Sequence, residues 1–174
     1  MSANKHFRSV APVDLPDNFF ARIGDDWMLI TAENSHGEVN TMTASWGCAG
    51  ILWNKPVAIC FIRPQRYTYG IVEDAETLTL SFFAEGQYRD ALRYCGTKSG
   101  RDGDKFAATG LTVDHAENGA PYVDEANLVL VCRKLYADDL KENCFIDPEM
   151  LKHYAARDYH RFYICEIAEV LVRE

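Results

Sequence analysis

The chain has 174 residues, of which 48% are hydrophobic and 25% are charged. This length is enough to bury one substantial core and too short for two typical domains, so we expect a single domain over residues 1–174. Its 18 Lys and Arg against 26 Asp and Glu give a net charge of -8. That charge would repel a phosphate backbone, so we expect no nucleic-acid partner, and any anionic ligand requires a local cluster of cations.

The lack of a recognisable secretory signal and the pattern of cysteines both favour the cytoplasm. Met1 to Pro12 lacks the apolar run of a secretory signal, and no apolar stretch approaches the roughly 20 residues that cross a bilayer. Cys60, Cys132 and Cys165 lie in apolar, strand-like runs, and none of the six cysteines forms a Cys-x-x-Cys pair. We therefore expect buried free thiols in a soluble, cytoplasmic protein without membrane contact.

The first predicted elements form a hairpin. Trp27 to Thr31 has the composition of a short strand, the polar residues 33–37 that of a turn, and Val39 to Ser45 that of a returning strand. Four later runs are rich in β-branched, aromatic and aliphatic residues, which is the composition of buried strands. These runs are Val57 to Ile62, Thr77 to Phe83, Leu128 to Tyr136 and Phe162 to Val172.

Short helices are predicted between these strands, from cap-like starts, Pro64 and terminating glycines. They span Gln65 to Asp74, Tyr88 to Tyr94, Lys105 to Gly110 and Pro148 to Ala156. Ala137 to Asp147 is polar and irregular, so we expect a loop there that folds over something. Strands separated by short helices without regular alternation favour an α+β, mainly β barrel over a doubly wound sheet.

A cluster of cations follows the predicted strand Val57 to Ile62. Arg63 and Arg66 stand with Thr68 where the strand ends and a helix begins. Amides at a helix N-terminus carry positive partial charge, and arginine grips phosphate oxygens through two hydrogen bonds, so this is a candidate site for a terminal phosphate. The alternative is that both arginines pair with surface carboxylates.

A run of small polar residues, Asn40 to Gly47, stands where a strand should be apolar. Small side chains expose the backbone, and a flavin ring needs a flat, mostly apolar slot with backbone donors and acceptors along its pyrimidine edge. Thr41 to Ser45 are therefore candidates for lining such a ring. An ordinary polar edge strand would have the same composition.

The segment Cys95 to Lys105 is dense in glycine, hydroxyls and cations. It lacks the Gly-Lys-Ser/Thr ending of a P-loop, which disfavours a nucleoside triphosphatase. As a flexible, donor-rich loop it could hold a phosphate or a ribityl chain, and the alternative is a solvated turn. Cys95 could also be imagined as a nucleophile with His160, but nothing in the sequence places the two together.

The five histidines show no metal-ligand spacing, and no cysteine stands near enough to complete a site, so we expect no bound metal. His160 is the candidate catalytic side chain. It opens the last predicted strand and could present an imidazole at the rim of the barrel, although a solvated histidine would occupy the same place.

In order along the chain, these segments resemble the FMN-binding split-barrel family of flavin reductases and flavoredoxins. Six blocks carry the resemblance, and their order and spacing make it specific. The blocks are Asn40 to Gly47, Leu52 to Pro56, Arg63 to Tyr69, Leu78 to Phe83, Cys95 to Lys105 and Asp158 to Arg161. One departure is Cys48-Ala49, where relatives are expected to carry glycines, and it leaves substrate access beside the ring open.

The resemblance implies a split β-barrel with short flanking helices that binds FMN non-covalently at a homodimer interface. It assigns the phosphate to Arg66, Thr68, Lys98 and Ser99 or a subset, with Arg63 nearby. It also implies that backbone and hydroxyl groups from Thr41 to Ser45 line the ring edge. The candidate cofactor-binding residues are Asn40, Thr41, Met42, Thr43, Ala44, Ser45, Arg63, Arg66, Tyr67, Thr68, Cys95, Gly96, Thr97, Lys98, Ser99 and Lys105.

The leading functional hypothesis is an NAD(P)H-dependent flavin oxidoreductase. In such an enzyme the nicotinamide stacks on FMN and passes it a hydride, so no acid or base side chain is strictly required. The absence of a Gly-x-Gly-x-x-Gly motif is uninformative, because the family binds its donor without a Rossmann domain. The alternatives are a flavoredoxin-type electron carrier with a redox protein partner, and a non-catalytic FMN-binding barrel.

Overall fold

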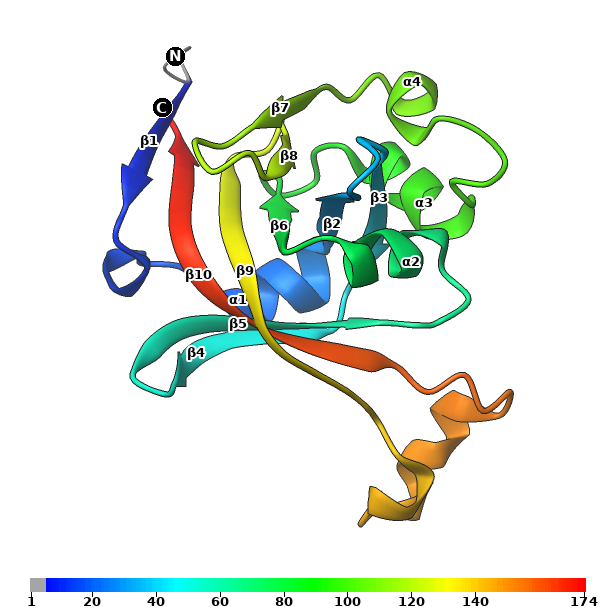
Figure 1. Ribbon diagram of the computed structural model, residues 1–174. Helices are drawn as coiled ribbons and strands as arrows, with labels where there is room; N and C mark the ends of the chain where they lie inside the picture. Colours follow the sequence, from blue (N-terminus) through cyan, green and yellow to red (C-terminus); the bar gives the residue numbers. More distant parts are fainter. Residues whose placement is uncertain (1–5) are drawn as a thin grey trace.

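The computed structural model describes residues 6–174, and its main feature is a curved antiparallel sheet flanked by short helices (Figure 1). Residues 1–5, part of the segment searched for a secretory signal, lie outside the described chain. The strands are β1 (Phe7–Val10), β2 (Met28–Glu33), β3 (Val39–Ala44), β4 (Gly47–Leu52), β5 (Lys55–Ile62), β6 (Thr77–Phe82), β7 (Val113–His115), β8 (Pro121–Val123), β9 (Leu128–Asp139) and β10 (Arg161–Arg173). The helices are α1 (Phe19–Ala21), α2 (Tyr67–Asp74), α3 (Arg89–Thr97) and α4 (Lys105–Thr109), with a π-helical turn at Arg22–Asp26 and 3-10 turns at Pro12–Asp14, Glu142–Cys144 and Pro148–Tyr154.

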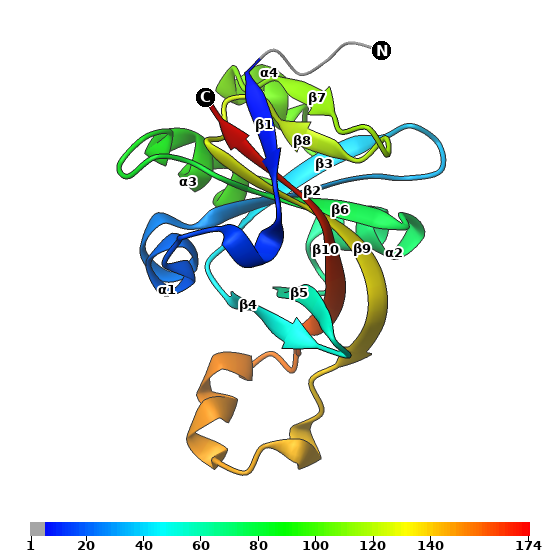
Figure 2. The same ribbon diagram turned by 90° about the vertical axis from the view of Figure 1, so that its left-hand side faces the viewer.

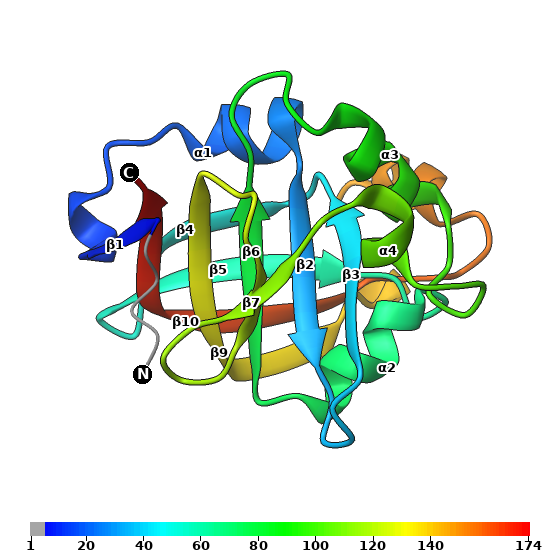
Figure 3. The same ribbon diagram turned by 90° about the horizontal axis from the view of Figure 1, so that it is seen from above.

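Strand β10 divides the sheet into two halves. On one edge it pairs with β9 over residues 161–172, whereas its other edge is shared between β5, at residues 161–166, and β1, at residues 170–173. Bulges at Ile164/Cys165 and Ile167/Glu169 interrupt the β9 pairing, and such bulges bend a strand. The order β3-β2-β6-β9-β10-β5-β4 therefore curls over, and β4 and β5 run across β2 and β6 (Figure 3). The predicted α+β, mainly β barrel is confirmed.

Both faces of the sheet are covered where β2, β6 and β9 lie. In β2, Met28 and Ile30 belong to the core inside the barrel, whereas Leu29 belongs to a second core beneath α3 and the β7–β8 hairpin. All three side chains are fully buried, and each such burial contributes about 1.5–3 kcal/mol. Strands buried on both faces are continuous apolar runs, which is why composition located them. Among the helices of residues 6–174, none is long and apolar enough to span a bilayer.

Helix α3 is longer than expected. The sequence predicted a helix over Tyr88 to Tyr94, but the structure places Cys95, Gly96 and Thr97 in its last turn, so their assignment to a flexible loop was wrong. Position 96 packs on β3, since a Cβ there would be in van der Waals contact, at 3.4 Å, with Cβ of Thr43. The hydroxyl of Thr97 donates to the carbonyl of Arg93 at 2.9 Å, which satisfies a group in the helix itself.

Residues 140–160, which we call the arm, project from the barrel between β9 and β10 (Figures 1 and 2). The loop expected over Ala137 to Asp147 was wrong in its first part, since β9 continues to Asp139 and pairs there with Arg161. The helix expected over Pro148 to Ala156 is instead a 3-10 helix that ends at Tyr154. Ring contacts among Phe145, Tyr154 and Tyr159 pack the turns of the arm together.

Candidate functional site

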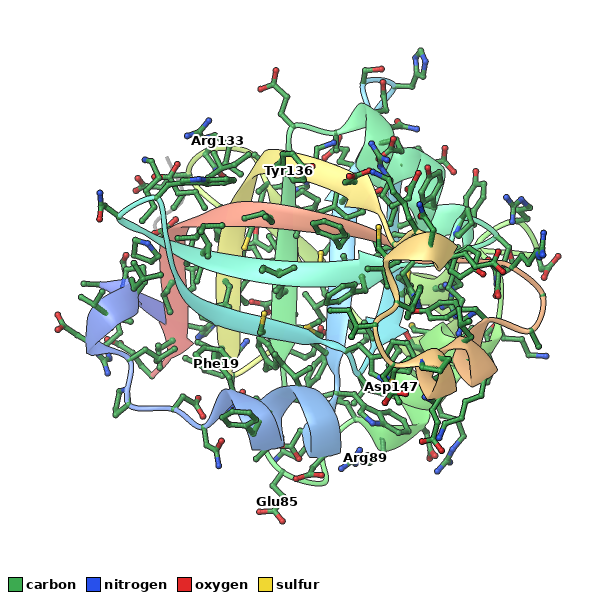
Figure 4. The ribbon with its side chains drawn as sticks, turned by 90° about the horizontal axis from the view of Figure 1, so that it is seen from below. Phe19, Glu85, Arg89, Arg133, Tyr136 and Asp147 are labelled. Atoms are coloured by element: carbon green, nitrogen blue, oxygen red, sulfur yellow. The ribbon has the colours of Figure 1, made fainter. Side chains whose placement is uncertain are left out.

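A pocket of about 190 Å³ lies where β3 and β5 end and α2 and β10 begin. The structure brings to it Met42, Thr43, Ala44, Ser45, Arg63 and Arg66 from the candidate cofactor-binding residues, together with His160. In Figure 4 the arm, marked by Asp147, lies beside the end of β5 and so borders this region. Segments far apart in the chain therefore converge on one site, as their order in the sequence predicted.

One wall of the pocket is the end of β3. This strand pairs with β2 alone among the described strands, so it is an edge of the sheet and its outer backbone groups do not belong to a ladder. The side chains of Thr43, Ala44 and Ser45 are small, and all three residues line the pocket. The run of small polar residues is thus an edge strand, as the alternative interpretation expected. The end of the same strand forms one wall of the pocket.

The most informative electrostatic feature is a pair of cations without carboxylate partners. Arg66 donates to the carbonyls of Gly96 and Cys95 at 2.7 and 2.9 Å, and Lys105 donates to those of Thr41 and Cys95 at 2.8 and 3.2 Å. Within residues 6–174 neither cation forms an ion pair with Asp or Glu. Within the described chain these charges are therefore held by carbonyl dipoles and by no carboxylate, and their remaining positive charge favours an anionic ligand.

Burial acts on both of these cations. It lowers the pKa of Arg66 and, together with the charge of Arg66, lowers the pKa of Lys105 to about 8. Lys105 is only 3% exposed, so its charge is poorly screened by water. The carbonyls of Cys95 and Gly96 belong to the C-terminal turn of α3, where the negative end of the helix dipole favours cations, and that of Thr41 belongs to β3.

Arg63 has a different role from Arg66. Its guanidinium forms an ion pair with Asp158, donates to the carbonyl of His153 at 3.0 Å, and lies 5.2 Å from the ring centroid of Tyr154. All three partners are in the arm. The alternative that an arginine pairs with a carboxylate thus holds for Arg63, which ties the arm to the pocket, and does not hold for Arg66.

His160 lies at the junction of the arm and β10. It is 8% exposed, its Nδ1 lies 3.0 Å from the hydroxyl of Tyr154, and its ring centroid is 5.0 Å from that of Trp46. Burial, and after it the charge of Arg63, lowers the pKa of His160 from 6.5 to about 4, with Asp158 opposing. The imidazole is therefore neutral at physiological pH and presents a hydrogen-bonding group, not a charge, to the pocket.

This shift predicts a pH-dependent contribution to stability. The native state disfavours the imidazolium, so below the unfolded-state pKa of 6.5 the unfolded chain binds more protons and stability is lost as the pH falls toward 4. The loss is about 3 kcal/mol for this group. In urea titrations, the unfolding free energies of wild type and His160→Asn should therefore converge by roughly that amount between pH 7.5 and 4. A difference that stays constant with pH would contradict the assignment.

The loop after α3 packs over the start of α2. The guanidinium of Arg101 lies 5.1 Å from the ring centroid of Tyr67, whose hydroxyl donates to Glu38. Gly100 is required at this contact, since a Cβ there would lie 2.5 Å from the Tyr67 ring. Lys98 and Ser99 connect α3 to this contact, so they lie near the start of α2.

Several candidates are not among the residues that line the pocket. These are Asn40, Thr41, Tyr67, Thr68, Cys95, Gly96, Thr97, Lys98, Ser99 and Lys105. Thr68 is fully buried and its hydroxyl accepts from Nδ2 of Asn40 at 3.1 Å, which gives it a packing role beneath the helix start. Cys95 is fully buried and burial raises its pKa, which opposes a nucleophilic role.

Trp46 and Phe61 line the pocket but were not among the sequence candidates. The signal for Phe61 was present in the alternation of β5, where Cys60 and Ile62 are buried in the core and the residue between them points the other way. Trp46 lies within the run Asn40 to Gly47, from which only Asn40 to Ser45 were named as candidates. Across the described residues, no three His, Cys, Asp or Glu side chains are placed to hold a metal ion.

Comparison with known proteins supports a common fold. Flavoredoxin of Desulfovibrio vulgaris is 24% identical, with 85% of this chain and 69% of that chain covered and a TM-score of 0.67. An FMN-binding protein of Thermus thermophilus is 21% identical, with 94% and 80% covered and a TM-score of 0.64. An NADH:FAD oxidoreductase of Streptomyces globisporus is 18% identical, with 86% and 77% covered and a TM-score of 0.63. At these sequence identities the similarity shows a common fold and nothing more.

No curated protein matches the chain. A family model, described as the flavin reductase like domain, matches residues 20–174. This match covers almost the whole chain and includes every element that borders the pocket, so the predicted split β-barrel with short flanking helices is confirmed. The chain belongs to the flavin reductase-like family, and its function is of the flavin-binding oxidoreductase type.

Proposed function

We propose that the chain binds FMN non-covalently in this pocket and catalyses its reduction by NAD(P)H. The observation that carries the proposal is the pair Arg66 and Lys105 beside the edge of β3, for which residues 6–174 supply no carboxylate partner. A phosphate monoester supplies the missing negative charge, and a planar ring system fits a wall of small side chains on an edge strand. The two cations thus fit the phosphate of FMN, and the wall of small side chains fits its ring system.

In this arrangement the phosphate contacts Arg66 and the loop that carries Lys98 and Ser99. Residues 43–45 would hold the ring, and their outer backbone groups would hydrogen-bond to its pyrimidine edge. Bound FMN would supply two-electron redox chemistry. Trp46 and Phe61 exclude water from the ring, and neutral His160 offers a hydrogen bond without adding a charge.

Reduction by a nicotinamide requires that its ring stack on the flavin within hydride-transfer distance. The small side chains at positions 43–45 leave room for this, and no side chain has to move a proton. The Streptomyces relative is named as an NADH:FAD oxidoreductase bound to NAD and FAD fragments, which favours the same pairing here. Flavoredoxin among the similar structures favours the second candidate, an electron carrier that exchanges electrons with a redox protein partner.

We also propose that the protein works as a cytoplasmic homodimer with one domain per chain. The pocket volume of about 190 Å³ is below the about 300–1,000 Å³ of typical ligand sites, so a second subunit would complete it. The arm borders the pocket and carries exposed apolar side chains, among them Ile146, which is fully exposed. Light scattering of the FMN-bound protein at micromolar concentration should therefore give twice 19.7 kDa, and a monomer would contradict this proposal.

The first test of cofactor identity is direct. Purified protein, reconstituted with FMN and freed of excess cofactor, should retain an oxidised-flavin absorption spectrum and release FMN on denaturation. Riboflavin, which lacks the phosphate, should bind at least tenfold more weakly because it cannot meet the two cations. Equal affinity for FMN and riboflavin would remove the phosphate from the assignment.

A further inference from the structure

A second cavity shares Ser45 and Trp46 with the flavin pocket. It has a volume of about 400 Å³ and is lined among others by Phe19, Phe20, Ile23, Gly24 and Ala49. We call it the apolar cavity. It lies between β4 and the segment of α1 and the π-helical turn, the region marked by Phe19 in Figure 4. Its volume falls within the about 300–1,000 Å³ of small-molecule sites.

The lining of the apolar cavity contains no charged side chain, in contrast to the flavin pocket with Arg63 and Arg66. Burial raises the pKa of the Cys48 thiol, the one ionisable group of the lining, so this group is neutral as well. Two aromatic side chains stand at its rim, Phe20 at 93% exposure and Trp46 at 42%. Large exposed rings around an apolar hollow mark a site that something covers.

We propose that the apolar cavity binds an uncharged, planar aromatic electron acceptor of the quinone class. The occupant is a small molecule because the hollow is of ligand size, is uncharged, and adjoins the flavin pocket through two shared residues. A flat ring placed against Trp46 would be stabilised by stacking, which neutral aromatic rings do well. The proposal rests on the proposed function for the source of the electrons.

The electron balance of this step is complete. The nicotinamide donor loses a hydride, which carries two electrons, and becomes NAD(P)⁺. The quinone gains those two electrons and two protons, one of them from solvent, and becomes the hydroquinone. The flavin returns to its oxidised form, so no further oxidant or reductant is needed.

Two glycines provide a matched pair of blocking and control variants. A Cβ at Gly24 or at Gly50 would meet no atom within 4 Å, so a side chain can start at either position without a backbone clash. Gly24 lines the apolar cavity, whereas Gly50 lies on β4 and lines a neighbouring apolar hollow. Gly24→Phe should therefore fill the cavity, and Gly50→Phe adds the same ring beside it.

Equilibrium dialysis against tetramethyl-1,4-benzoquinone tests the site on FMN-free and FMN-bound protein. This quinone is fully substituted and cannot add to Cys48. Wild type and Gly50→Phe should bind with dissociation constants within twofold of each other, and Gly24→Phe should bind at least tenfold more weakly. In turnover with NAD(P)H, Gly24→Phe should lower kcat/KM for the quinone by the same factor and leave ferricyanide reduction unchanged.

Absence of saturable quinone binding by wild type, or equal affinity in all three proteins, would overturn the proposal. If Gly24→Phe converts a dimer into a monomer with quinone affinity unchanged, the cavity is covered by a second copy of the chain and the proposal also fails. The dialysis experiment uses no reductant, so its outcome does not depend on whether a nicotinamide reduces the flavin.

Discussion

Arg66→Ala is expected to raise the dissociation constant for FMN about ten- to a hundredfold, which corresponds to about 1.5–3 kcal/mol for one charged phosphate contact. Arg66 lines the pocket and forms no ion pair with Asp or Glu within residues 6–174, so its charge is available to the ligand. Fluorescence titration of FMN at fixed ionic strength measures the effect, because flavin emission changes on binding.

Two further variants serve as controls for the Arg66→Ala measurement. Arg133→Ala removes a surface arginine that pairs with Glu166, and it should leave FMN affinity within twofold of wild type. Arg66→Lys keeps the charge and loses the planar fork, so it should recover part of the affinity. Affinity unchanged in Arg66→Ala, with circular dichroism showing an intact fold, would reject the phosphate assignment.

Lys105→Met should weaken FMN binding. It should also abolish the decrease in FMN affinity that we expect for the wild type at alkaline pH. The free protein holds the pKa of Lys105 at about 8, and a bound anion favours the charged ammonium. Above pH 8 the free protein must take up a proton before it binds well, so wild-type affinity should fall by up to about tenfold between pH 7 and 9. The methionine variant has no such group and should bind weakly at both pH values.

Lys134→Met is the matched control. Lys134 also donates to backbone carbonyls, those of Val72 and Glu73 in α2, whereas Lys105 shares the carbonyl of Cys95 with the pocket-lining Arg66. It should leave the pH profile of FMN binding unchanged. A wild-type affinity that is flat from pH 7 to 9, or an identical slope in Lys105→Met, would show that Lys105 does not act on the ligand.

The sequence located elements best where burial dictates composition. β2, β5, β6, β9 and the end of β10 lie in or between the two cores, and their apolar runs were predicted within a few residues. β4 was missed because Gly47 and Gly50 give it the composition of a turn. Gly47 is required in that strand, since a Cβ there would lie 2.8 Å from the carbonyl of Ile59.

The candidate site was predicted only in part, and the part that the sequence could not predict has a physical cause. Local sequence made both arginines after β5 candidate phosphate ligands, and only the fold separates them. Arg63 meets Asp158, which lies ninety-five residues further along the chain, and no local pattern announces that pairing. The three-residue strands β7 and β8 were missed for a similar reason, because long-range packing on β6 and β2 selects them rather than local propensity.

The most direct test of the central claim is anaerobic stopped-flow mixing of the FMN-bound protein with NADH and, separately, NADPH. We expect at least one of the two to bleach the oxidised-flavin absorbance at about 1 per second or faster, as turnover requires. Dithionite serves as the positive control for a reducible bound flavin. If dithionite bleaches the protein and neither nicotinamide does so, the reductase proposal is contradicted and the electron-carrier function takes its place.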